Sequence, residues 1–432
     1  MQFDQMLPLE HPTMRILVIT NLYPPIYYGG YELECRDIIE GLAARGHDIT
    51  VVTSMSGVGS PRVDGNVHRL MRLKGEEVPA ANYANKIAHL GTYLRAQMRS
   101  ASISLHNSKA VKSVLNQVRP DVAYVWNLCD VTLSPLVAVS ERGIPRVHRL
   151  GSLWMAEGLE YHLVSSRVQR LMRSILRNVR NPDVYLKKGI FLTCSDFLGR
   201  QVIKAGLPKE SVFTIYTFVP IPDEVQPMYD GPIFRMLWAG RLCEEKGVHI
   251  AVRAAGELAK DPATGPFELC IVGSGPEDYT SRLKQEIADL KLEDRVHLAG
   301  VVPREQLAGM YSERHAFLFT SIWDEPFGQV LTESMGRGLP VIASPAGGSA
   351  EFLTNEENAL TFPIGDHMAL AAAIRRLMND RELRGRLRET GLRTVRERFG
   401  FEKTLDLHEH YLLSAAGRAA APAVAERTIG NC

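Results

Sequence analysis

Two glutamates at a fixed spacing are the side chains of this sequence best suited to chemistry. Glu325 and Glu333 stand in the segment Asp324–Gly336 (DEPFGQVLTESMG), with seven residues between them. We expect a helix to begin near Gly328, which puts Glu333 about 8 Å along its axis. A sugar ring and a ribose joined by a pyrophosphate are a comparable distance apart. The spacing therefore predicts that Glu325 accepts hydrogen bonds from sugar hydroxyls and Glu333 from a ribose, while the helix N-terminus faces the diphosphate.

Each glutamate also has a simpler explanation. Taken alone, Glu333 fits a solvent-facing helix residue, and Glu325 fits a partner of the helix dipole. The Phe-Gly step between them, at this spacing, favours the ligand site.

Two cations five residues apart are the second candidate. Arg241 and Lys246 flank a loop in Ala239–Val248 (AGRLCEEKGV), directly after an apolar run. A guanidinium can hold a pyrophosphate with two parallel hydrogen bonds, and an ammonium adds a point charge. The alternative is a solvated loop in which Lys246 pairs with Glu244 or Glu245.

Glycine pairs mark two further loops. Gly29–Gly30 lies in YPPIYYGGY and Gly347–Gly348 in PVIASPAGGSAE. Such pairs let backbone N–H groups approach a phosphate, although plain turns have the same composition. The Gly-x-Gly of Ile271–Pro276 lacks the third glycine of a dinucleotide-binding motif, so it predicts a tight turn rather than an NAD site.

Alternating strands and helices must position these loops. We expect a helix over Leu33–Ala44, because apolar residues recur there at helical spacing. This alternation predicts an α/β protein with two Rossmann-like, doubly wound parallel-sheet domains. The expected strands are Arg15–Thr20, Ile49–Thr53, Val122–Trp126, Arg146–Leu150 and Ile190–Cys194 in the first domain, and Met236–Ala239, Leu269–Val272, Val296–Leu298, Ala316–Thr320 and Pro340–Ala343 in the second.

Composition supports this division. A chain of 432 residues exceeds one ordinary core. We expect a first domain over 14–216, a proline-rich linker over 217–232 and a second domain over 233–399. A helix over about 400–416 is expected to return to the first domain, and 417–432 to form a loose tail.

Charge and hydropathy limit the partners. The sequence is 45% hydrophobic and 23% charged, and its formal net charge of +1 gives no general attraction to nucleic acid. Six scattered cysteines, a polar beginning and the lack of a long apolar run predict a cytoplasmic protein, at most peripheral at a membrane. A helical arginine stripe could dock on anionic lipid, or it could be the solvated face of an ordinary amphipathic helix; its members are Arg167, Arg170, Arg173, Arg177 and Arg180.

Together these segments resemble the family 4 retaining glycosyltransferases of the GT-B fold. The resemblance runs from Ile16 to about Leu413 and rests on PPIYYGGYELE with LAARGHDITVVTS, AGRLCEEKGV, DEPFGQVLTE and GLPVIASPAGGSAEFL, in this order. It implies two domains facing each other across a cleft. The C-terminal domain would hold a nucleotide-diphosphate sugar of UDP or GDP type, and the N-terminal domain an unidentified hydroxyl acceptor such as a sugar, a lipid-linked glycan or a small molecule.

The resemblance also implies roles for individual residues. It assigns Gly29 and Gly30 to the phosphate and sugar of the donor, Arg241 and Lys246 to the pyrophosphate, and Glu333 to the ribose. The backbone of Val302 would touch the base, and the donor sugar would be held by Glu325 with the backbone of Phe327, Gly328 and Gln329. It implies no cofactor and no metal, because the two cations would stabilise the departing diphosphate.

The sequence departs from the family pattern at two positions. The family usually places a histidine near the end of a strand in the first domain, where this chain has Gly151 in VHRLGSLW. Either His148, three residues earlier, serves in a bulged strand, or another group takes the role. Gln329 stands where an apolar residue is commoner, and its amide could tune the choice of sugar. We expect His47 to be structural and His408 to be an ordinary helix residue.

Other functions on the same fold remain open from the sequence. They are a nucleotide-sugar epimerase, a phosphorylase, and a catalytically silent nucleotide-sugar-binding protein.

Overall fold

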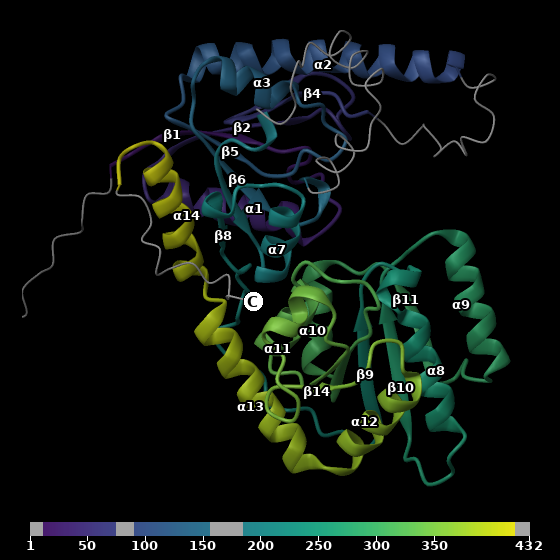
Figure 1. Ribbon diagram of the computed structural model, residues 1–432. Helices are drawn as coiled ribbons and strands as arrows, with labels where there is room; N and C mark the ends of the chain where they lie inside the picture. Colours follow the sequence, from purple (N-terminus) through teal and green to yellow (C-terminus); the bar gives the residue numbers. More distant parts are fainter. Residues whose placement is uncertain (1–11, 75–89, 156–184, 420–432) are drawn as a thin grey trace, which may run out of the picture. The chain divides into compact units, whose positions relative to one another are not determined.

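The computed structural model describes residues 12–74, 90–155 and 185–419, which form two compact units (Figure 1). Unit 1 takes in the chain up to Ile215 and again from Leu405, and unit 2 is Tyr216–Thr404. The arginine stripe expected over 167–180 and most of the expected tail lie outside the described residues.

Unit 1 contains an eight-stranded sheet in the order β3-β4-β2-β1-β5-β6-β7-β8. All neighbours are parallel except β3 and β4, which form an antiparallel pair. Its centre is buried because Ile16–Ile19 and the whole of β5 are apolar. The strands are β1 Arg15–Ile19, β2 Asp48–Ser54, β3 Arg62–Asp64, β4 Val67–Met71, β5 Val122–Val125, β6 Arg146–Leu150, β7 Ile190–Thr193 and β8 Val212–Thr214.

The helices of unit 1 are amphipathic. α1 (Gly30–Ala44) buries Cys35, Ile38, Ile39 and Leu42, which recur at helical spacing. The others are α2 Leu90–Val118, α3 Ser134–Glu141, α7 Asp196–Lys204, the short helix η1 Lys209–Ser211 and α14 Phe401–Ala415.

Helix α14 joins unit 1 through buried polar contacts. Glu409 lies 2.9 Å from Nε2 of His47 and 2.5 Å from a guanidinium nitrogen of Arg45. His408 is fully buried, contacts the Tyr124 hydroxyl and stacks on Trp126. His408 thus lies in a helix, as expected, and its ring fills part of the core of unit 1.

Unit 2 contains a six-stranded, fully parallel sheet in the order β11-β10-β9-β12-β13-β14. Helices α8, α9 and α12 share one apolar core with it, and α11 packs against α13 (Figure 1). The strands are β9 Phe234–Ala239, β10 Phe267–Val272, β11 Val296–Gly300, β12 Ala316–Phe319, β13 Val341–Ala343 and β14 Leu360–Thr361. The helices are η2 Glu244–Lys246, α8 Val248–Ala259, α9 Glu277–Asp289, α10 Arg304–Ser312, α11 Gln329–Gly336, η3 Gly347–Glu351, α12 His367–Asn379 and α13 Arg381–Arg398.

Two segments differ from the sequence expectation. Helix α1 begins at Gly30 rather than Leu33, so the glycine pair stands at the helix mouth. The start of the proline-rich segment packs inside unit 2, since Phe218 and Val219 are buried and the Val219 N–H donates to the Phe399 carbonyl (2.9 Å).

Candidate active site

The order of strands in unit 2 singles out one edge of its sheet. From β9 the chain runs outward through β10 and β11, then returns to the other side of β9 with β12, β13 and β14. The loops after β9 and β12 therefore leave neighbouring strands where the strand order reverses. In open parallel sheets such a switch point is where ligands bind.

A lysine and a glutamate meet at this switch point. Nζ of Lys246, in the loop after β9, lies 2.5 Å from Oε1 of Glu325, in the loop after β12. The side chain of Glu325 is 6% exposed and that of Lys246 is 29% exposed. Lys246 thus pairs with Glu325, rather than with Glu244 or Glu245 beside it in the sequence.

Backbone contacts hold these two loops together. Gly247 has a φ of 65°, and a Cβ there would lie 2.0 Å from the Thr320 carbonyl oxygen. The Thr320 hydroxyl donates to the Lys246 carbonyl (3.1 Å), and the Glu245 carbonyl accepts the N–H of Ile322 (2.9 Å). Only glycine fits this approach, so Gly247 sets the position of Lys246.

The glycine pair of unit 2, Gly347–Gly348, holds Glu325 from the other side. The Gly348 N–H donates to the Glu325 carbonyl (2.6 Å), and Gly347 has a φ of 59°. A Cβ on Gly347 would lie 2.5 Å from that same carbonyl oxygen. The pair therefore positions the glutamate, and its contact with a donor stays a prediction.

Helix α11 begins as the sequence suggests. Gly328 precedes it with a φ of 94°, and within the described residues no side chain caps its N-terminal N–H groups. Phe327 is 3% exposed and packs against Phe352 and Phe399, with ring centres 5.5 and 5.3 Å away. Phe327 thus anchors the turn, and the mouth of α11 opens beside Glu325 with the polarity that suits an anion.

Glu333 is paired with a residue that the sequence reasoning missed. Arg304 places a guanidinium nitrogen 2.8 Å from Oε1 of Glu333. It is the first residue of α10, two positions after Val302, which is half-buried in the loop after β11. The salt bridge therefore connects the loop expected to touch the base with the acid expected to bind the ribose. Nothing in the local sequence signals this pairing.

Arg241 lies in an adjoining loop with its side chain exposed. The Leu242 N–H donates to the Ser274 carbonyl (2.8 Å), and a Cβ on Gly273 would lie 1.8 Å from the Gly240 carbonyl oxygen. The Gly-x-Gly turn after β10 thus presses directly on the loop after β9. In the described part of the chain, Arg241 makes no salt bridge, which leaves its guanidinium available to a ligand.

In unit 1, the predicted glycine pair stands at the N-terminus of α1. The Gly29 N–H donates to a carboxylate oxygen of Glu32 (3.0 Å). One amide of this helix mouth is therefore already used within the chain. The roles of Gly29 and Gly30 at the donor stay predictions.

The structure gives no support to His148 as a replacement for the family histidine. His148 is fully buried in β6 and stacks on Phe191 (4.8 Å between ring centres). Burial, together with the nearby charge of Arg146, lowers the pKa of His148 to about 3. A ring without exposed surface is a core residue in this conformation.

The place beside Gly151 is filled by a tyrosine. A Cβ on Gly151 would lie 2.6 Å from the ring of Tyr31. That ring packs against Trp126, with centres 5.4 Å apart, and its hydroxyl donates to the Arg149 carbonyl. A larger residue at position 151 would displace Tyr31, which explains why glycine stands there.

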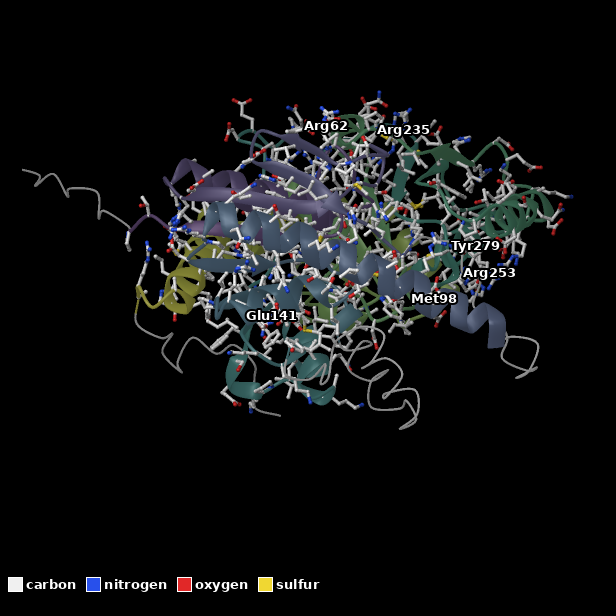
Figure 2. All side chains as sticks on the ribbon, turned by 90° about the horizontal axis from the view of Figure 1, so that it is seen from above. Arg62, Met98, Glu141, Arg235, Arg253 and Tyr279 are labelled. Carbon is white, nitrogen blue, oxygen red and sulfur yellow. The ribbon has the colours of Figure 1, made fainter. Side chains whose placement is uncertain are left out.

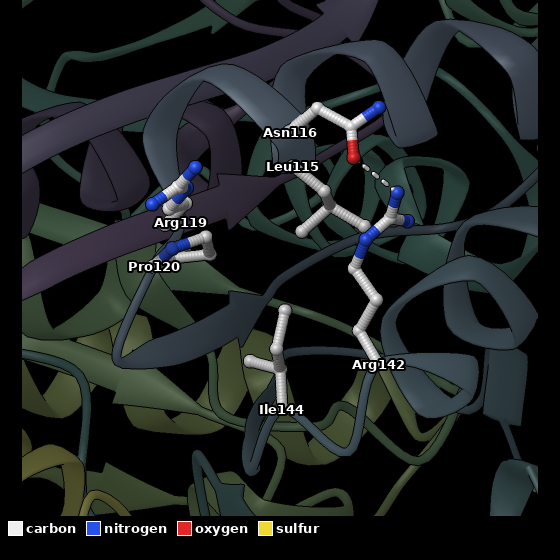
Figure 3. A pocket seen from close by; sticks show the side chains of 6 residues that line it. All are labelled: Leu115, Asn116, Arg119, Pro120, Arg142 and Ile144. Atoms are coloured by element: carbon white, nitrogen blue, oxygen red, sulfur yellow. Dashed lines mark hydrogen bonds between the residues drawn. The ribbon is translucent and has the colours of Figure 1, made fainter.

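The described residues of unit 1 line two cavities, and none of the candidate site residues lines either of them. One of about 490 Å³ is at the amino edge of the sheet, between the ends of α2 and α3, where Arg119 and Arg142 reach its rim (Figure 3). The other, of about 470 Å³, is at the carboxyl edge, between the loops after β2 and β4 and helix α2. Only the second lies at the edge where parallel sheets bind ligands.

Among the described residues, no group of three or more His, Cys, Asp or Glu side chains could hold a metal ion. None of the described helices has the length and apolar character needed to cross a bilayer.

Known proteins are similar to this chain in sequence and in architecture. A model of Glycosyltransferase Family 4 matches residues 28–221, and a model of group 1 glycosyl transferases matches residues 231–394. The lipopolysaccharide core biosynthesis glycosyltransferase LpsD of Rhizobium meliloti is 30% identical over 336 residues, which cover 76% of this chain and 86% of that protein. The chain therefore belongs to the family 4 glycosyltransferases, and it is a glycosyltransferase.

Solved structures show the same fold. A glycosyltransferase from Rickettsia africae is 16% identical, with a TM-score of 0.67 over 94% of this chain and 99% of that one. Anabaena Alr3699/HepE, solved in complex with UDP and glucose, is 21% identical, with a TM-score of 0.63 over 93% of this chain and 100% of that one. The expected GT-B fold, with two parallel-sheet α/β domains, is confirmed.

Proposed function

We propose that this glycosyltransferase takes a hexosyl group from a nucleotide-diphosphate sugar of UDP or GDP type and transfers it with retention of anomeric configuration. The observation that carries the proposal is the 2.5 Å pair of Lys246 and Glu325 at the switch point of the second sheet. In this pair a cation that would bind the diphosphate stands next to a carboxylate that would accept hydrogen bonds from sugar hydroxyls. The complex of Anabaena Alr3699/HepE with UDP and glucose supports a donor of this kind.

The pair can bind a donor without being broken. An ammonium has three N–H donors and a carboxylate two oxygens, so one bond between them leaves room for a ligand on each. Lys246 would donate to the pyrophosphate while the second oxygen of Glu325 accepts from a sugar hydroxyl. The exposed Arg241 would add a forked contact to the same diphosphate.

Catalysis would come from positioning and from charge on the leaving group. Arg241, Lys246 and the N-terminus of α11 would offset the negative charge that develops on the departing diphosphate. We propose that the reaction needs no metal ion and that the leaving phosphate accepts the proton of the acceptor hydroxyl. Glu333 with Arg304 would bind the ribose, the backbone of Val302 the base, and the backbone of Gly328 and Gln329 the sugar.

Two experiments test the donor site. In a thermal-shift series with UDP-, GDP-, ADP- and dTDP-sugars, the sugars of one base should raise the melting temperature. At a hundredfold excess of ligand over Kd, the free energy of unfolding should rise by about 2.7 kcal/mol. Arg241→Ala and Glu325→Ala should each lower turnover of that donor by about a hundredfold or more. Turnover within a few-fold of wild type for both variants would overturn the assignment.

Product analysis tests the remaining parts of the proposal. The anomeric configuration of the product, read by NMR, should equal that of the donor, and a chelator should leave the rate unchanged. An inverted product or a chelator-sensitive rate would contradict the proposal. We also propose action in the cytoplasm with peripheral membrane contact, which cell fractionation tests.

A further inference from the structure

The cavity at the amino edge of the first sheet is lined by arginines from two helix ends (Figure 3). Arg119 directly follows α2, and Arg142 directly follows α3. Pro120 and Ile144 line the cavity just before β5 and β6 begin, and Leu115 lines it from the last turn of α2. The cavity therefore lies at the edge of the sheet opposite to the one where parallel sheets bind their substrates.

The acids next to these arginines in the sequence are paired with other cations. An oxygen of Glu141 (Figure 2) lies 2.7 Å from Nζ of Lys112. An oxygen of Asp121 lies 3.2 Å from guanidinium nitrogens of both Arg15 and Arg418. Among the described residues, the two arginines of the cavity form no salt bridge. Their positive charge is therefore available to a ligand.

The helix ends do not cancel this charge. The carboxyl end of a helix carries about half a negative charge, so α2 and α3 together supply about one. The two guanidinium groups supply two positive charges, and Arg146, buried at the start of β6, supplies another. Burial lowers the pKa of Arg146 to about 10, so it stays charged at neutral pH, and within the described residues it has no acidic partner. The described groups at this edge thus carry a net positive charge, which favours an anion.

Both arginines of the cavity are held in place before a ligand arrives. Nη2 of Arg142 donates to Oδ1 of Asn116 (2.5 Å), which ties the end of α3 to α2 (Figure 3). Arg119 has a φ of 48°, and its N–H donates to the Leu115 carbonyl (3.1 Å). Glycine usually takes this left-handed position at a helix end, and an arginine is strained there. Such strain is common at ligand sites, and binding by the Arg119 guanidinium would explain it.

We propose that this cavity is a second ligand site of the protein and that it binds a phosphate ester. A phosphate has three oxygens that can accept from guanidinium groups on different sides, whereas a planar carboxylate suits a single one. The apolar lining of Leu115, Pro120 and Ile144 would pack against the C–H face of the attached sugar or glycerol, and the Asn116 amide would donate to a hydroxyl. A volume of about 490 Å³ is in the range of small-molecule sites.

The test measures binding of a phosphate ester to the full chain. In titration calorimetry, glucose 6-phosphate should bind about tenfold tighter than glucose, with a preference that weakens in salt. Co-sedimentation with phosphatidylcholine vesicles, with and without phosphatidic acid, tests a lipid headgroup as the source of the phosphate. Calorimetric binding without co-sedimentation identifies a soluble ester, and co-sedimentation that requires phosphatidic acid identifies a lipid.

Variants tie the preference to the cavity. Arg119→Gln and Arg142→Gln should each reduce affinity for the phosphate probe about tenfold. Arg72→Gln is the matched control and should leave the affinity unchanged, because Arg72 is exposed on unit 1 and forms no salt bridge within the described residues.

One further variant separates ligand binding from a structural role. Arg119→Gly removes the charge and relieves the backbone strain, so it should weaken phosphate binding without lowering the melting temperature. Arginines that only complement the helix ends would give the reverse result, namely a lower melting temperature and unchanged binding.

Two results would overturn the inference. One is that neither glucose 6-phosphate nor phosphatidic acid binds the wild type more tightly than its neutral counterpart. The other is a preference that survives the double variant Arg119→Gln with Arg142→Gln; if Arg241→Ala abolishes it, the phosphate binds at the donor site. The inference is independent of the proposed function, whose failure has a different signature, namely the absence of any melting-temperature rise with nucleotide sugars.

Discussion

The pairing of Lys246 with Glu325 makes a prediction about stability that needs no knowledge of the substrate. Lys246→Met removes the cation and leaves a carboxylate whose side chain is only 6% exposed. A buried charge without a partner pays most of its desolvation penalty, because little water can replace the lost contact. We therefore expect unit 2 to lose stability even when no ligand is present.

The magnitude follows from the geometry. At an effective dielectric constant of about 20, unit charges 2.5 Å apart attract by about 7 kcal/mol, and desolvation of both groups offsets most of that. Removing one member of a buried pair costs about 3–5 kcal/mol. Since the Lys246 side chain is 29% exposed, we expect about 2–3 kcal/mol, which lowers the melting temperature of unit 2 by about 5–10 °C.

Differential scanning calorimetry of the full chain measures this loss. Arg253→Met, at a residue labelled in Figure 2, is the matched control. It breaks the Arg253–Glu286 pair of 2.6 Å, whose side chains are 46% and 27% exposed. That surface pair should contribute less than about 1 kcal/mol. The double variant Lys246→Met with Glu325→Gln should recover part of the loss, because no unpaired charge remains. Equal, small losses for Lys246→Met and Arg253→Met would refute the reasoning.

The remaining predictions concern backbone fit, pH and domain assembly. Gly247→Ala places a Cβ 2.0 Å from a carbonyl oxygen at a φ of 65°, so it should destabilise unit 2 by about 2 kcal/mol or more. The control is Gly309→Ala on α10, where a Cβ meets open space. In the same calorimetry that variant should be neutral or stabilising by up to about 1 kcal/mol. Burial holds the pKa of His148 at about 3, so the unfolded chain takes up a proton that the folded chain refuses below pH 6.5. Unit 1 should therefore lose about 1.4 kcal/mol of stability per pH unit from this group as pH falls from 6.5 toward 3. Urea titrations at pH 7.5 and 5.5 measure the change in the free energy of unfolding between the two pH values. That change should be smaller for His148→Leu than for the wild type, and an equal change would contradict the prediction. Glu409→Gln weakens the contacts of α14 with His47 and Arg45. It should lower the free energy of unfolding of unit 1 by about 1–3 kcal/mol and speed amide hydrogen exchange in α14. Unchanged exchange in α14 would contradict the role given to these contacts.

Much of the site could be predicted because its signals are local. A run of apolar residues followed by glycine and a charged residue already specifies a buried strand, a turn and a polar side chain at the carboxyl edge. Arg241 follows that pattern, and Lys246, Glu325 and Gly328 lie within a few residues after an expected strand; the structure places all four on the loops after β9 and β12.

The contacts between those loops could not be predicted. Lys246 has two acids beside it in the sequence, yet it pairs with one 79 residues away, because parallel strands bring their loops together without regard to separation along the chain. Arg304 meets Glu333 for the same reason. The weakly apolar strands β3 and β4 were missed as well, since they are specified by pairing rather than by pattern.

The sequence by itself thus determined the class of fold, the strands at the centre of both sheets and the types of residue available at their carboxyl edges. Periodicity and turn chemistry act over a few residues, which is why a reader of the sequence can find them. Only the tertiary structure decided which charges are paired, that His148 lies in the core, and that Tyr31 fills the space beside Gly151. Those outcomes depend on packing between distant segments, where a gap of one or two ångströms separates a contact from a clash.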